Sequence, residues 1–100
     1  MLSNPSTALQ VKVGTEFVIT LRATPSNGFL WYLSALSPAE SLQVVEKWTE
    51  PLDGYRGCLQ KFSVKALQVG EGEMNFSYRR SWEATAAQEA TFFVTICSEH

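Results

Sequence analysis

Apolar and polar side chains alternate along most of this chain, and this period of two constrains the fold more than any other feature. The alternating segments are separated by turn-forming residues such as glycine, proline and asparagine. A period of two is typical of a β-strand with one buried face. The pattern predicts strands over residues 8–13, 16–23, 29–34, 42–48, 60–69 and 73–82, and a last strand with Phe92, Val94 and Ile96 facing inward.

This spacing of strands and turns is typical of sandwiches. We expect an all-β fold, an immunoglobulin-like antiparallel β-sandwich of about seven to eight strands. The length of 100 residues suits a single domain, residues 1–100. Trp31 is expected in the core, and the Gly70-Glu71-Gly72 segment is expected to be a turn, since no helix follows it to hold a phosphate. Residues 84–90 have helix propensity and could form one turn.

The composition excludes several classes of partner. Apolar residues make up 45% of the chain and charged residues 18%, as in folded proteins, and the net charge is −2. Without a basic field, we expect no binding to nucleic acid or to an anionic membrane. No apolar run approaches the ~18 residues of a membrane span, and the first residues do not resemble a signal peptide. The compartment is left open, because a leader could have been removed.

The two cysteines, Cys58 and Cys97, match no metal or redox spacing. A disulfide between them is compatible with the sequence but not required, and we predict free thiols. Cys58 is expected in a loop. Two hypotheses remain for it: an exposed thiol that forms a mixed disulfide with a partner, and a passive buried thiol.

Catalytic groups are scarce in this sequence. The one histidine is His100, the last residue of the chain, and no His, Cys or carboxylate cluster has metal spacing. Glu71 and Glu73 are close in sequence, and solvated surface charge explains them. We therefore predict that the protein is not an enzyme and needs no cofactor or metal.

Recognition by loops is the remaining function class. In an immunoglobulin-type sandwich, residues 24–28 and 80–90 would project from one end, with residues 51–58 beside them. These loops carry Tyr55, Arg56, Arg80 and Trp82, and Trp, Tyr and Arg dominate binding hot spots. The parity of Trp82 along its strand leaves both a core position and a binding position open.

Three segments in order resemble motifs of the chagasin family, which inhibits papain-like cysteine peptidases. Residues 24–28, Thr-Pro-Ser-Asn-Gly, followed by Trp31, are similar to the family's Asn-Pro-Thr-Thr-Gly motif with its Trp. Arg80-Ser81-Trp82 is similar to Arg-Pro-Trp, and it too follows a tyrosine, Tyr78. The family's glycine-rich segment is degraded to Tyr-Arg-Gly-Cys at residues 55–58. Ser81 replaces a proline, which predicts a less preorganised last loop and weaker binding.

The resemblance implies a reversible, competitive inhibitor that occludes the cleft of a papain-like cysteine peptidase, of papain or cathepsin L type, with three loops. It implies that Asn27 and Gly28 lie nearest the catalytic thiolate and that the protein is a monomer when free. The implied peptidase-binding residues are Pro25, Ser26, Asn27, Gly28, Tyr55, Arg56, Gly57, Arg80, Ser81 and Trp82.

Two alternatives stand beside this hypothesis. A sandwich of this kind could have kept the fold and bind another partner, as an immunoglobulin-like protein-interaction or adhesion module, because fold does not fix function. A small hydrolase is the weaker alternative, for want of a general base.

Overall fold

The computed structural model describes residues 6–24, 28–51 and 57–98. Within these ranges the chain forms seven strands and no helix, so no described helix is long and apolar enough to cross a membrane. The strands are β1 (Ser6–Lys12), β2 (Glu16–Ala23), β3 (Phe29–Ser37), β4 (Leu42–Pro51), β5 (Cys58–Ala66), β6 (Gly70–Arg80) and β7 (Gln88–Cys97).

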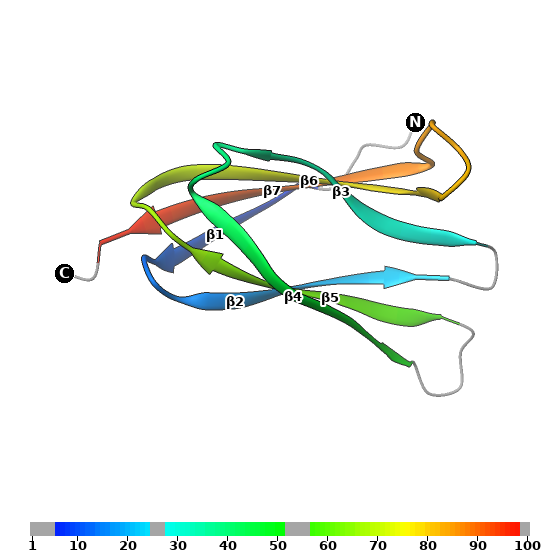
Figure 1. The fold of residues 1–100 in the computed structure, drawn as a ribbon, viewed down its shortest axis with the longest axis horizontal. Coiled ribbons are helices and arrows are strands. Elements are labelled where there is room, and N and C mark those ends of the chain that lie inside the picture. The colour runs from blue at the N-terminus through cyan, green and yellow to red at the C-terminus, as the bar shows by residue number, and fades with distance from the viewer. Residues whose placement is uncertain (1–5, 25–27, 52–56, 99–100) are drawn as a thin grey trace.

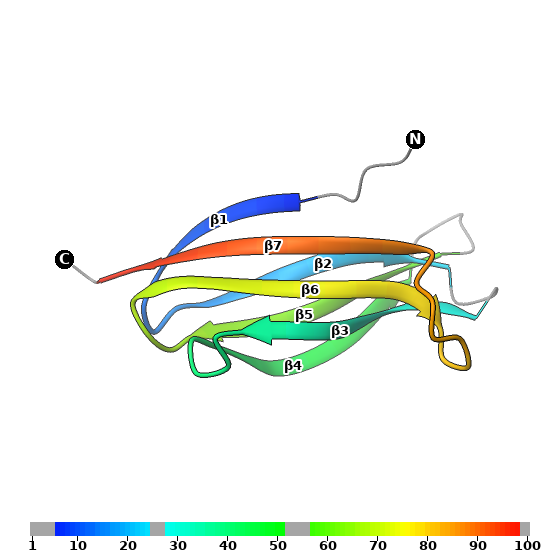
Figure 2. The ribbon, with the colours of Figure 1, turned by 90° about the horizontal axis from the view of Figure 1, so that it is seen from above.

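The strands make two layers, as Figure 1 shows. One sheet has the order β1-β7-β6-β3 and the other the order β2-β5-β4. All pairs are antiparallel except β1 with β7, which is parallel, and Figure 2 shows β7 between β1 and β6. The predicted all-β sandwich is confirmed, with this one parallel pair as a detail that alternation alone does not specify.

The core lies between the two inner faces. The largest fully buried side chains are Phe76, Met74, Ile96, Val64 and Val94. Phe76 is the centre of an aromatic cluster, with ring centroids 4.9 Å from Phe62 and 5.7 Å from Phe92. Offset and edge-on aromatic contacts of this kind each stabilise the fold by roughly 0.5–1.5 kcal/mol beyond burial. The predicted inward face of the last strand is confirmed, since Val94 and Ile96 are fully buried and Phe92 packs against the core.

Several predicted strand boundaries were wrong. The strand expected over residues 60–69 begins at Cys58 and ends at Ala66. It ends there because pairing with both neighbouring strands stops at this point: the last pairs are Glu16 with Lys65 and Leu42 with Ala66. The strand expected to reach Trp82 ends at Arg80, whose partner Phe29 is the first residue of β3. Residues 84–87 form no helical turn, and β7 begins at Gln88.

The Gly-Glu-Gly segment is not a turn. Gly70 and Gly72 are part of β6, where they pair with Ile96 and Val94. Gly72 is buried, and a Cβ atom built on it would lie 2.8 Å from Leu42 Cδ1. The second glycine therefore allows the start of β4 to pack closely on β6.

Candidate functional site

Three connections leave the sandwich at one end. Ala23, the last residue of β2, pairs with Cys58, the first residue of β5, and Pro51 at the end of β4 pairs with Cys58 from the other side. In the second sheet, β3 begins opposite the end of β6, and β7 begins beside it (Figure 1). We call this the loop end; its boundary residues are Ala23, Phe29, Pro51, Cys58, Arg80 and Gln88.

The strands on either side of the first connection are tied together by polar contacts. The Thr24 amide donates to the Tyr78 hydroxyl at 2.9 Å, and the indole Nε1 of Trp31 donates to the Arg22 carbonyl at 2.8 Å. Trp31 itself is 6% exposed, so its predicted place in the core is confirmed. These bonds join the end of β2 to the other sheet, which fixes the two points where the connection starts and returns.

Gly28 belongs to the first connection and directly precedes β3. Its φ is +81°, a region that side chains with a Cβ rarely adopt. A Cβ atom built on Gly28 would lie 2.9 Å from Cη2 of Trp82, closer than such atoms come in real structures. Glycine is thus needed for the backbone conformation and for the close approach of the Trp82 ring.

Trp82 is an exposed residue, 72% accessible, and the core position that its parity left open is wrong. It stands just beyond β6, in a turn closed by a 3.0 Å hydrogen bond from the Glu83 amide to the Arg80 carbonyl. Because the strand has ended, the alternation of β6 no longer determines where this side chain points.

Arg80 lies between the aromatic residues of the two connections. Its guanidinium is 4.6 Å from the ring centroid of Phe29 and 5.9 Å from that of Trp82, and it makes a 3.7 Å ion pair with Glu83. Phe29 in turn stacks on Tyr78, with centroids 5.3 Å apart. Cation–π contacts at exposed sites stabilise by roughly 0.5–1 kcal/mol, so these rings and the guanidinium order one another at the surface.

The structure brings together four of the ten predicted binding residues. Gly28, Arg80, Ser81 and Trp82 gather where the first and third connections meet. Gly57 is half-buried and directly precedes β5, at the second connection. The other predicted residues, Pro25, Ser26, Asn27, Tyr55 and Arg56, lie outside the described residues.

Two residues of this end were not singled out in the sequence. Phe29 supplies the ring beneath Arg80, and Arg79 contacts the turn that carries Trp82. An aromatic residue directly after a turn glycine is the signal that could have identified Phe29. Arg79 has no comparable signal, because an arginine on the outer face of a strand is an ordinary solvated residue.

The cysteines are free thiols, as predicted. Cys58 is the first residue of β5 and is only 9% exposed, so the expected loop position was wrong, and the buried-thiol hypothesis is the one that the structure supports. In the described ranges no three His, Cys, Asp or Glu side chains are grouped so that they could hold a metal ion.

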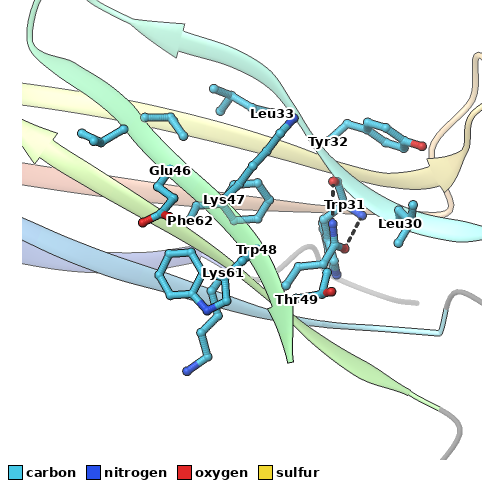
Figure 3. Close-up of a pocket in the computed structure, with 13 residues that line it drawn as sticks. Leu30, Trp31, Tyr32, Leu33, Glu46, Lys47, Trp48, Thr49, Lys61 and Phe62 are labelled. Atoms are coloured by element: carbon cyan, nitrogen blue, oxygen red, sulfur yellow. Dashed lines mark hydrogen bonds between the residues drawn. The ribbon is translucent and has the colours of Figure 1, made fainter. Parts of the chain in front are cut away.

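A groove of about 790 Å³ runs along one flank of the sandwich, between β3 and β4 (Figure 3). These are the edge strands of the two sheets, and Leu33, Lys47 and Phe62 are among the residues that line the groove. The dashed lines at Trp31 in Figure 3 are two hydrogen bonds with the Gln60 side chain, which cross from one sheet to the other.

Comparison with known proteins gives consistent matches over nearly the whole chain. The family model described as Chagasin family peptidase inhibitor I42 matches residues 10–96. Amoebiasin-1 of Entamoeba histolytica is 28% identical to this chain in an alignment of 96 residues, which covers 93% of this chain and 91% of that protein.

Two solved structures share the fold. The cysteine protease inhibitor EhICP2 from Entamoeba histolytica superposes with a TM-score of 0.78 at 20% identity, over 93% of this chain and 87% of that one. PbICP-C, solved in complex with falcipain-2, superposes with a TM-score of 0.70 at 16% identity, over 97% of this chain and 90% of that one.

Proposed function

The chain belongs to the chagasin family of peptidase inhibitors, and from this we propose that it is a reversible, competitive inhibitor of papain-like cysteine peptidases. In this proposal the three connections of the loop end enter the active-site cleft together and exclude the substrate. An interface of this kind needs roughly 800 Å² from each partner, which three adjacent loops can supply.

The exposed Trp82 beside Gly28 is the observation that carries the proposal. An indole that is 72% accessible leaves a large apolar surface in water, and such residues are typical of binding hot spots. Arg80, Phe29 and Gly28 contact one another or Trp82, so the side chain belongs to an ordered surface that links two connections. A preordered surface loses less conformational entropy when it binds.

The backbone at Gly28 supports inhibition rather than cleavage. A peptidase cleaves a substrate that presents an extended segment with its carbonyl in the oxyanion hole. A φ of +81° at Gly28 departs from that extended geometry. The first connection would therefore occupy the catalytic centre, with Asn27 and Gly28 nearest the thiolate, without aligning a scissile bond.

The relatives support a cysteine peptidase as the partner. EhICP2 is described as a cysteine protease inhibitor, and PbICP-C was solved in complex with falcipain-2. We extend this to the present chain as a target of papain or cathepsin L type. We also propose that the free inhibitor is a monomer, because the loop end must be accessible to enter a cleft.

Steady-state inhibition of papain and of a cathepsin L type enzyme tests the proposal. Wild type should inhibit competitively, and Trp82→Ala should raise Ki by at least ~30-fold, as expected for a hot-spot residue worth about 2 kcal/mol. Phe93→Ala is the matched control: Phe93 is also an exposed aromatic residue, but it lies within β7 opposite Glu73. This control should change Ki by less than ~2-fold.

Absence of inhibition by the folded wild type across several papain-like peptidases would overturn the proposal. The partner of the loop end would then have to be sought among other proteins, as for an interaction or adhesion module. An equal rise in Ki for Trp82→Ala and Phe93→Ala would instead show that Trp82 has no special part in binding.

A further inference from the structure

The turn after β6 has a position that suits proline, and this chain has serine there. The hydrogen bond from the Glu83 amide to the Arg80 carbonyl makes residues 80–83 a four-residue turn, with Ser81 as its second residue. Neither Ser81 nor Trp82 has a positive φ, as expected of a type I turn. Proline at the second position of such a turn presets φ, and the serine leaves that restraint out.

Arg79 makes three contacts with the backbone of this turn. Its Nη1 atom donates to the carbonyl of Arg80 at 3.2 Å, to that of Ser81 at 3.4 Å and to that of Glu83 at 3.1 Å. The Ser81 and Glu83 carbonyls have no other hydrogen-bond donor in the described part of the chain. One side chain thus holds both ends of the turn and its interior.

The guanidinium of Arg79 is itself held in place. It lies 4.6 Å from the ring centroid of Tyr32, on the adjacent strand β3. Arg79 pairs with Leu30 across the two strands, so Tyr32 is its diagonal neighbour on the same face. A planar guanidinium can stack on a ring and still donate from its edge, which a lysine ammonium cannot do.

We propose that Arg79 is a positioning residue for inhibition: it fixes the turn that presents Trp82 and so replaces the restraint that a proline at position 81 would supply. The inference rests on the proposed function, since the orientation of Trp82 matters for inhibition only if Trp82 enters the peptidase cleft. Arg79 acts through the turn and makes no contact with the peptidase.

The test uses four variants of the full chain: Arg79→Met, Ser81→Pro, the double variant and Arg79→Lys. Methionine keeps the apolar stem without the donors, and lysine keeps the charge without the planar fork. The Ser81 amide donates no hydrogen bond within the described residues, so proline removes none there. Lys12→Met is the matched control, because Lys12 ends β1 at the far end of the sandwich from Arg80.

The first measurement needs no peptidase. Amide hydrogen exchange of Glu83, followed by NMR, should be at least ~10-fold faster in Arg79→Met and Arg79→Lys than in wild type. Exchange in the double variant should return to within ~3-fold of wild type, and Lys12→Met should leave it unchanged. Unchanged exchange at Glu83 in Arg79→Met would overturn the positioning role.

The second measurement is Ki for papain. Arg79→Met should raise Ki about 10-fold. Adding Ser81→Pro to Arg79→Met should lower Ki most of the way back to the wild-type value, whereas Ser81→Pro in the wild-type background should lower Ki far less. An equal fold decrease in Ki from Ser81→Pro in both backgrounds would overturn the inference, because the effects of independent substitutions are additive. If wild type does not inhibit, the proposed function fails, and the exchange of Glu83 still decides whether Arg79 holds the turn.

Discussion

Gln60 holds Trp31 by both of its backbone groups. The Gln60 Oε1 atom accepts from the Trp31 amide at 2.7 Å, and Nε2 donates to the Trp31 carbonyl at 3.2 Å. Gln60 belongs to β5 and Trp31 to β3, so the contact crosses from one sheet to the other. It provides hydrogen-bond partners for the Trp31 amide and carbonyl on the edge of β3 that faces away from β6, just after the first connection of the loop end.

Replacing Gln60 by methionine should therefore destabilise the whole fold. Gln60→Met keeps the length of the side chain but leaves the buried amide and carbonyl of Trp31 unpaired, at a cost of about 1–3 kcal/mol for each group. We expect the free energy of unfolding in urea to fall by about 2–4 kcal/mol. Gln43→Met, an exposed residue on β4, is the control and should change it by less than ~0.5 kcal/mol.

Two glycines allow the effect of backbone strain to be measured separately from the effect of contact with Trp82 at the loop end. Gly14 has a φ of +87° and open space where a Cβ would stand, whereas Gly28 has a φ of +81° and the Trp82 ring 2.9 Å away. Both Gly14→Ala and Gly28→Ala should lose about 1–2 kcal/mol of unfolding free energy from the left-handed backbone. Gly28→Ala alone should also raise Ki, by at least ~10-fold, because the new methyl group displaces Trp82.

Urea denaturation and papain inhibition of the two glycine variants provide the measurements. An unchanged Ki in Gly28→Ala would show that the position of Trp82 against Gly28 is unimportant for binding. A raised Ki in Gly14→Ala would show that strain far from the loop end is transmitted to it.

The Tyr78 hydroxyl should contribute to stability through a single bond. Tyr78→Phe removes the acceptor of the Thr24 amide and leaves the ring contacts with Phe29 and Trp31 in place. We expect a loss of about 1 kcal/mol and faster exchange of the Thr24 amide, measured by denaturation and NMR. Tyr32→Phe is the control, since its hydroxyl makes no hydrogen bond within the described residues. Equal losses in both variants would contradict the assignment.

The two thiols should differ in reactivity because they differ in exposure. Cys58 is buried at the start of β5, whereas Cys97 is partly exposed. Alkylation of Cys97, measured in Cys58→Ser, should be at least ~10-fold faster than alkylation of Cys58, measured in Cys97→Ser. Inhibition by Cys58→Ser should be the same with and without reductant. A reductant-dependent Ki that disappears in Cys58→Ser would restore the mixed-disulfide hypothesis.

Alternation in the sequence was sufficient to predict that the strands exist and which faces point inward, because burial of one face imposes a period of two, but it did not predict where several strands begin and end. It could not predict the parallel pairing of β1 with β7, which depends on contacts between opposite ends of the sequence. Leu33 shows a further limit. It pairs with Phe76 on the inner face, as its parity with Trp31 predicts, yet it is 38% exposed, since the flank between two edge strands is open.

At the loop end, the sequence identified residue types but not their contacts. Trp82 was a candidate on its chemistry, and its exposure follows from the end of β6 two residues earlier, which depends on where β3 begins. The importance of Arg79 could not be predicted, because its partners are backbone carbonyls that only the folded turn brings within reach. Family motifs could point to Arg80 and Trp82 but not to a residue that takes over the role of a missing proline.

The place of β7 between β1 and β6 affects the order in which the protein folds during its synthesis. β1 is synthesised long before the strand it pairs with, since β7 is its one neighbour among the described strands of the sheet. The same late segment supplies the Ala87 amide that donates to the Tyr78 carbonyl at 2.8 Å beside the Trp82 turn. Pairing over such long sequence separations is slow. A nascent chain should therefore acquire its ordered loop end only after residues 87–97 have emerged.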